Sequence, residues 1–189
     1  MNPQADLVAR AKQALTPNYN PAPISFARGE GMWLYDEAGK RYLDFAAGIA
    51  VSALGHAHPA LVEAISAQAR EVLHTSNLFL VRHAIELAEK LNGVCFSDRV
   101  YFGNSGAEAN EAAFKIARRY MRLVRGEDRF EFICAHGSFH GRTWAAITAT
   151  GQPKYQKGFA PLVPGFLHVP YDDLAAVEAA IGPHTCAVF

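Results

Sequence analysis

The sequence is poor in cysteine, has no excess of charge of either sign and contains no long hydrophobic run. Its three cysteines, Cys95, Cys134 and Cys186, lie far apart and include no Cys-x-x-Cys pair. This odd, scattered set argues against a disulfide framework and favours free thiols in a reducing compartment, so we expect a cytoplasmic protein. No apolar stretch reaches membrane-spanning length, and the start MNPQADLVARAKQAL lacks the apolar core of a signal peptide.

The charge balance and two missing motifs argue against nucleic-acid binding and against a nucleotide phosphate loop. Eighteen basic residues balance eighteen acidic ones, which leaves no basic footprint for nucleic acid and no field for steering acidic substrates. The arginines between 118 and 129 are therefore expected on a solvated helix face. Neither Gx₄GK[ST] nor GxGxxG occurs, so the sequence does not support a nucleotide phosphate loop.

Eight histidines raise the question of a metal site. His56 and His58 form one close pair, and His136 and His140 stand four apart, which is the spacing of zinc ligands on a helix. Gly137 and Gly141 disfavour a helix there, and no acidic general base lies between His136 and His140. We expect no metal site, and we expect the first pair to shape a turn.

The first half of the chain predicts helices and a small antiparallel piece. The periodicity of apolar residues and the turn chemistry predict a helix over 3–15, an extended proline-rich crossing, a hairpin around 36–39 and helices over 59–73 and 81–92.

The second half alternates between strand-like and helical stretches. RVYFG, FEFICA, FLHVP and TCAVF read as strands, and 105–125, 143–150 and 173–181 read as helices between them. This order predicts an α/β fold with a mainly parallel sheet. Because the last stretch, Cys186–Phe189, resembles the middle of a buried strand, we expect the chain to be a fragment of a longer protein.

The stretch YFGNSGAEANEAAFKIARRY predicts a strand, a tight turn and a helix. Ser105 and Glu108 are spaced as a capping box, and the backbone amides of Gly106 and Ala107 can point at an anion. Residues at three- and four-residue steps predict one buried stripe on the helix: Ala109, Ala112, Ala113, Ile116, Ala117, Tyr120, Met121 and Val124. On these residues alone, a phosphate site and a plain helix cap are equally supported, because Glu108 and Glu111 would repel a dianion unless they turn away.

A second turn, HGSFHGRT, follows the strand FEFICA and supplies Phe139, His140 and Arg142. Ligands of parallel α/β sheets lie beyond the carboxyl ends of the strands, so the two turns should face one site. An anionic aromatic cofactor could place its phosphate on the helix start and its ring against Phe139, while Arg142 grips a substrate carboxylate. Taken singly, Phe139 could equally be a core residue and Arg142 a solvated one.

These motifs, with YNPAPI, FAAGIAVSALGHAHP and HTSN, resemble the class III aminotransferases that use pyridoxal phosphate. The resemblance covers nearly the whole chain and implies a fold-type I transferase, with residues 1–60 in the small domain and 61–189 forming an incomplete large cofactor-binding domain. It implies that Ser105, Gly106 and Ala107 hold the cofactor phosphate and that Phe139 and His140 contact the cofactor. It also implies that Arg142 binds the substrate carboxylate, that Tyr19 and Ile49 line the substrate pocket, and that the parent is a homodimer acting on small amino and oxo acids.

The resemblance also indicates what the chain lacks. None of its six lysines, Lys12, Lys40, Lys90, Lys115, Lys154 and Lys157, matches the family's Schiff-base lysine. No catalytic residue can therefore be assigned, and we expect the isolated chain to be inactive. Family members act on acylated ornithines, ornithine or 4-aminobutyrate, and those alternatives stay open, as does a non-enzymatic chain or one completed by a second polypeptide.

Overall fold

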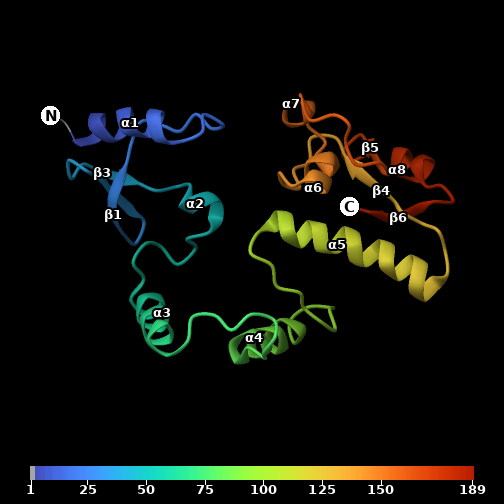
Figure 1. The fold of residues 1–189 in the computed structure, drawn as a ribbon, viewed down its shortest axis with the longest axis horizontal. Coiled ribbons are helices and arrows are strands. Elements are labelled where there is room, and N and C mark those ends of the chain that lie inside the picture. The colour runs from blue at the N-terminus through green and yellow to red at the C-terminus, as the bar shows by residue number, and fades with distance from the viewer. Residues whose placement is uncertain (1–2) are drawn as a thin grey trace. The chain divides into compact units, whose positions relative to one another are not determined.

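The computed structural model describes residues 3–189 (Figure 1). The chain divides into two compact units, Met1–Leu80 and Val81–Phe189. This division lies beyond the boundary at residue 60 expected from the sequence, so the helix that begins at Pro59 belongs to the first unit. The assignment of 61–189 to one cofactor-binding domain stays a prediction.

The first unit opens with a helix and a small antiparallel sheet. Helix α1 (Pro3–Ala14) precedes strands β1 (Phe26–Glu30), β2 (Trp33–Asp36) and β3 (Arg41–Leu43), which pair in the order β1-β2-β3. The predicted hairpin is confirmed, and its turn is closed by Asp36, whose Oδ1 accepts hydrogen bonds at 2.9 Å from the amides of Ala38 and Lys40. Strand β1 was not predicted.

Short helices complete this unit and begin the next one. Helix α2 (Ala47–Ala50) and helix α3 (Pro59–Glu71) follow the sheet, and α4 (Arg82–Asn92) opens the second unit. The predicted helices at 59–73 and 81–92 are thus confirmed, whereas α2 was missed. None of the described helices is long and apolar enough to cross a membrane.

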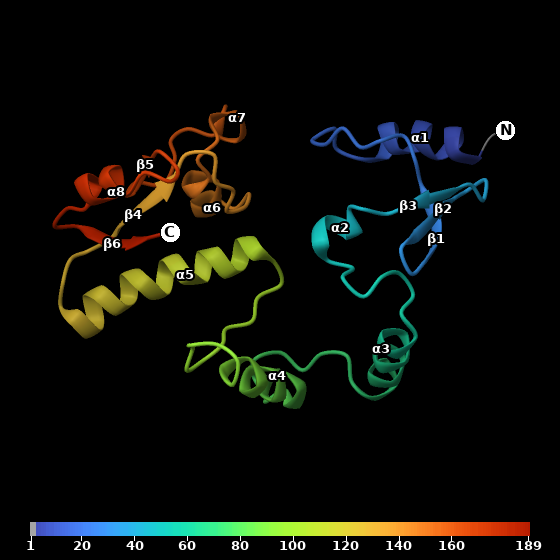
Figure 2. The same ribbon diagram turned by 180° about the vertical axis from the view of Figure 1, so that it is seen from behind.

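The second unit is built on a parallel sheet, as predicted. Strand β4 (Glu131–Ala135) lies between β5 (Phe166–Val169) and β6 (Thr185–Val188), and both pairings are parallel. Helix α6 (Trp144–Ala149) and the short α7 (Pro153–Gln156) follow β4, and α8 (Leu174–Ala180) follows β5. Figure 2 shows this unit from behind, with α5 (Gly106–Tyr120) running along the sheet.

One predicted strand is wrong, because RVYFG has no strand in the structure. A β-strand requires a partner for its backbone groups, and the described sheet contains only β5, β4 and β6. Tyr101 and Phe102 are accordingly 62% and 45% exposed.

The core lies between α5 and the sheet, and only part of the predicted stripe reaches it. Ala112 is 7% exposed, and Ala117 and Met121 pack against the core. Phe114 is 3% exposed, and its ring packs 5.0 Å from Phe132 and 5.1 Å from Phe166. Ile116, Tyr120 and Val124 of the predicted stripe are 58%, 48% and 69% exposed. Phe114, which the prediction left out, supplies the ring that packs against the aromatic side chains of the sheet. The buried face is therefore displaced from the centre of the predicted stripe toward Phe114.

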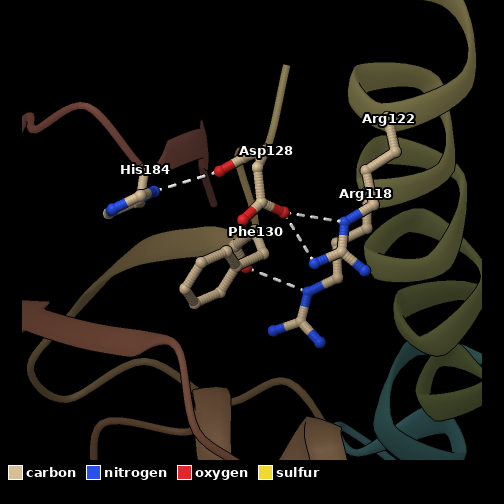
Figure 3. A network of polar contacts seen from close by, with 5 residues as sticks. All are labelled: Arg118, Arg122, Asp128, Phe130 and His184. Atoms are coloured by element: carbon tan, nitrogen blue, oxygen red, sulfur yellow. Dashed lines mark hydrogen bonds and ion pairs between the residues drawn. The ribbon is translucent and has the colours of Figure 1, made fainter. Parts of the chain in front are cut away.

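Arginines hold the carboxyl-terminal half of α5 and the following π-helical turn η1 (Met121–Arg125) to the segment that leads into β4 (Figure 3). Arg118 donates from Nε to the carbonyl of Phe130 at 2.9 Å, and Arg122 pairs with Asp128 at 2.8 Å. The expected solvated arginine face is therefore wrong for Arg118, which is half-buried. The element ends where Gly126 adopts a left-handed φ of 68°.

Candidate functional site at two turns beside the parallel sheet

The amino-terminal end of α5 carries the predicted capping box. Ser105 is the N-cap residue, and its Oγ accepts from the amide of Glu108 at 3.2 Å. In return the Glu108 carboxylate accepts from the backbone amide of Asn104 at 2.8 Å and from its side-chain amide at 3.1 Å. These contacts, led by the Asn104 side chain, lower the pKa of Glu108 below its ordinary value.

This arrangement leaves the first two amides of α5 available to an anion. The N–H groups of Gly106 and Ala107 have no carbonyl one turn earlier in the helix, and a Cβ built on Gly106 meets no atom within 4 Å. Glu108 is folded back onto Asn104, and Glu111 is bonded to the next helix. Both carboxylates are thus bonded to donors of the protein, Glu108 to Asn104 and Ser105 and Glu111 to the start of α6. A phosphate at this helix start stays a prediction.

The turn after β4 packs directly on this helix start. Gly141 is buried and has a φ of +129°, and a Cβ added to it would lie 2.7 Å from the Cβ of Ala107. Asn110 of α5 donates to the carbonyl of His140 at 2.6 Å, and Thr150 accepts from the His140 amide at 2.9 Å. The structure therefore brings together the two turns that the sequence predicted to face one site.

Glu111 ties the same two elements together, although sequence reasoning gave it no such role. Its Oε1 accepts from the hydroxyl of Thr143 at 2.6 Å and from the amides of Ala145 and Ala146 at 3.1 and 3.3 Å. It thereby caps α6 from α5 and fixes the backbone that follows Arg142. No local signal could have found this contact, because it joins residues 32 positions apart.

Phe139 and Arg142 form a surface cluster with Tyr155. The Arg142 guanidinium lies 4.3 Å from the centroid of the Tyr155 ring and 5.6 Å from that of Phe139. The Phe139 ring is 55% exposed and meets Tyr155 edge to face at 5.8 Å. An exposed aromatic face and a guanidinium beside it can hold an aromatic ring and a carboxylate. Tyr155 was missed, and its only signal was its position in the helix-like stretch PKYQ.

His140 points toward the interior rather than the surface cluster. Its ring lies 5.0 Å from that of Phe189, and its buried Nε2 has no hydrogen-bond partner within residues 3–189. Burial, with a smaller contribution from His168, lowers the pKa of the imidazole. Contact between His140 and a cofactor stays a prediction.

The two remaining predicted residues lie in the first unit. Tyr19 is 67% exposed and lines a pocket with α1 and the proline-rich segment. Ile49 is 93% exposed and has a left-handed φ of 63°. Their part in a substrate pocket stays a prediction. Throughout residues 3–189, no three His, Cys, Asp or Glu side chains gather in a group that could hold a metal ion.

The chain was compared with known protein families and with individual proteins. The class III aminotransferase pattern matches residues 14–188. The chain is 53% identical to the succinylornithine transaminase/acetylornithine aminotransferase of Pseudomonas aeruginosa over 92% of its length, and 54% identical to the acetylornithine aminotransferase of Gloeobacter violaceus over 94%. It spans 43% and 44% of those proteins, less than half of each.

Solved structures give the same picture of the fold. The ornithine aminotransferase of Toxoplasma gondii ME49 superimposes with a TM-score of 0.93 at 30% identity, over 100% of this chain and 45% of that one. An omega-transaminase of Thermomicrobium roseum does so with a TM-score of 0.88 at 32% identity, over 97% and 48%. The chain belongs to the class III aminotransferases, a family of pyridoxal-phosphate-dependent enzymes.

Proposed function

We propose that this chain is the N-terminal portion of an acetylornithine aminotransferase, which moves an amino group from N-acetylornithine to 2-oxoglutarate and yields N-acetylglutamate semialdehyde and glutamate, a step of arginine biosynthesis. The observation that supports the proposal is the packing of Gly141 against Ala107, which joins an open helix start to the turn that carries an aromatic ring and an arginine. The names of relatives more than 50% identical supply the substrate.

Each residue of the two turns has a proposed task. The amides of Gly106 and Ala107, with Ser105 beside them, hold the phosphate of pyridoxal phosphate, because they are open donors at a helix start. Phe139 lies against the cofactor ring, and His140 also contacts the cofactor. When bound, the cofactor withdraws electrons from the carbon that carries the amino group.

The substrate is held by groups outside the cofactor cradle. Arg142 binds a substrate carboxylate through two parallel hydrogen bonds, a geometry that its planar guanidinium favours. Tyr19 and Ile49 line the pocket for the remainder of the substrate. We further propose that the complete enzyme is a cytoplasmic homodimer.

Sibling activities on N-succinylornithine, ornithine and 4-aminobutyrate are the nearest alternatives. The Pseudomonas aeruginosa relative carries both succinylornithine and acetylornithine in its name, so this pair is the first comparison to make. A chain without activity of its own, or one completed by a second polypeptide, is the alternative of another kind. Since none of the six lysines matches the family's Schiff-base lysine, we expect the 189-residue chain alone to show no transamination.

The test is Arg142→Ala in an aminotransferase of full family length that begins with this chain. We expect kcat/KM for N-acetylornithine to fall by about one to two powers of ten, equivalent to about 1.5 to 3 kcal/mol, because one charge-assisted contact is lost. Arg142→Lys should restore little. The cofactor dissociation constant should barely change. Arg125→Ala, which removes an exposed ion pair with Glu127, is the matched control and should leave both quantities unchanged.

The same pair of measurements can overturn the assignment. If Arg142→Ala releases the cofactor while the reconstituted enzyme keeps its substrate kinetics, Arg142 belongs to the cofactor site. If the full-length enzyme moves no amino group from any acylated ornithine, the proposed substrate is wrong.

A further inference from the structure

The most strained backbone of the first unit lies in α2. Ala47, Gly48, Ile49 and Ala50 have φ values of 46°, 65°, 63° and 63°, so four consecutive residues are left-handed. Only Gly48 adopts this region without cost, and a β-branched residue such as Ile49 strongly disfavours it. Strain of this kind persists only where surrounding contacts impose it, and it gathers at functional sites.

Asp44 supplies the contacts at the start of this segment. Its Oδ1 accepts from the amides of Ala46 and Ala47, both at 2.9 Å, and its own amide donates to the carbonyl of Met32 at 2.8 Å. Its Oδ2 lies 2.7 Å from Nε2 of His56. The Asp44 side chain is only 8% exposed, although none of residues 4–80 is buried when the whole residue is counted.

His56 fastens the other side of the contact to the sheet. It exchanges two backbone hydrogen bonds with Gly31, at 2.9 and 2.8 Å. Its side chain lies so close to β1 that a Cβ added to Gly29 would be 2.6 Å from both Cβ and Cγ of His56. The imidazole is thus held between the Gly29 backbone and the Asp44 carboxylate.

The left-handed segment carries an isoleucine side chain that is exposed to solvent. Ile49 lies in the middle of the left-handed segment and is 93% exposed. Exposing an apolar side chain to water is unfavourable, so solvent does not stabilise this strained conformation. Phe45 and Val51 are also 92% and 81% exposed, so the exposure alone does not single out Ile49. The left-handed backbone does, and a ligand that contacts this side chain would account for it.

We propose that Asp44 and His56 form a clamp that holds residues 47–50 in the left-handed conformation and so positions Ile49 against the substrate. Both are positioning residues, and the clamp sets how well the enzyme distinguishes one amino donor from another. This inference rests on the proposed function, because it takes Ile49 to line the substrate pocket.

The test compares clamp variants with a matched aspartate in the same active, cofactor-loaded enzyme of full family length. Asp44→Ala and His56→Ala remove the clamp from each side, and Gly29→Ala displaces His56 without touching Asp44. Asp36→Ala is the control, since Asp36 also accepts two backbone amides and one side-chain donor, but in the hairpin turn.

Two readouts are needed. Amide hydrogen exchange of residues 46–52 should accelerate in the clamp variants and stay unchanged in Asp36→Ala. The ratio of kcat/KM for N-acetylornithine to that for ornithine should change by at least about threefold in the clamp variants only, a modest share of what one apolar pocket contact can discriminate.

A double-mutant cycle decides whether the clamp acts through Ile49. If it does, adding Asp44→Ala to Ile49→Ala should cause no further change in the ratio of kcat/KM for N-acetylornithine to that for ornithine. Unchanged exchange in the clamp variants overturns the clamp, and altered exchange with an unchanged donor ratio overturns its role in selection. If the unmodified enzyme transaminates neither donor, the proposed function fails, while hydrogen exchange still decides whether the clamp exists.

Discussion

The two units of this chain hold their candidate site residues by different physical means. In the second unit, the two turns rest on a core in which Phe132, Ile133 and Ala146 are 0% exposed. In the first unit, residues 4–80 contain no buried residue, and the segment carrying Ile49 is held by Asp44 and His56. A buried apolar core supports one set of residues, and hydrogen bonds of Asn110 and Glu111 add to it. The other set is held by a few hydrogen bonds without such a core.

The difference predicts different sensitivities. A packed site loses its geometry when a core volume changes or when a glycine at a close contact gains a side chain. A site held by charge-assisted hydrogen bonds responds to the loss of a single polar group and to pH.

The largest effect is expected in the core of the second unit. Phe132→Ala should lower the free energy of unfolding by about 3 to 5 kcal/mol, because it leaves a cavity between the rings of Phe114 and Phe166. Urea unfolding, followed by the reactivity of the buried Cys134 thiol, measures this loss. Phe45→Ala is the control in the first unit, where the ring is 92% exposed, and should change stability by less than about 0.5 kcal/mol. Equal losses would contradict the comparison.

A smaller loss is expected where the two turns meet. Gly141→Ala places a Cβ 2.7 Å from that of Ala107, so it should cost about 1 to 3 kcal/mol of stability and weaken pyridoxal phosphate binding. Absorbance titration with the cofactor, beside urea unfolding, measures both. Gly137→Ala is matched, since its φ of +80° is also left-handed but no atom lies within 4 Å of the added Cβ. It should lose some stability through backbone strain and leave the cofactor titration unchanged.

Acid should loosen the clamp of the first unit. The hydrogen bond from His56, followed by the Ala47 amide, lowers the pKa of Asp44 below its ordinary 3.8. Because the folded form binds the proton more weakly than the unfolded form, this stabilisation is complete above the ordinary pKa and is lost as pH falls through the folded one. Asp44→Asn should therefore flatten the acid dependence of hydrogen exchange at residues 46–52.

The second unit supplies the counterpart for that measurement. Glu108→Gln should flatten the acid dependence at the start of α5 instead, since the pKa of Glu108 is also lowered. If either variant alters the acid response of the other unit's segment, the two hydrogen-bonded sites are not independent.

The smallest effect on stability, and the simplest measurement, concerns the thiols. Burial raises the pKa of Cys134 to about 11 and also raises that of Cys186, whereas hydrogen bonds from Ser97 lower the pKa of the exposed Cys95. A disulfide reagent at neutral pH should label Cys95 first and leave the other two thiols unlabelled until the second unit unfolds. Mass spectrometry of the labelled peptides identifies each site, and early labelling of Cys134 would contradict a closed core.

Local signals in the sequence were sufficient for most elements and for the composition of the two turns. The capping box of Ser105 and Glu108, the hairpin turn at Asp36 and the alternation of strand and helix all depend on residues within a few positions of each other, and each is present. The family followed from the same short motifs. Such features can be predicted from the sequence because the interactions that form them join residues only a few positions apart.

Contacts between distant residues were decided only by the tertiary structure. Helix α5 packs through Phe114 against Phe132 and Phe166, and this packing leaves Ile116 and Tyr120 of the predicted stripe exposed. RVYFG has the composition of a strand but no partner among the described strands. Glu111 caps α6, Gly141 rests on Ala107, and His56 and Asp44 together hold four left-handed residues. Their energies depend on which surfaces meet, so no pattern within one segment determines them.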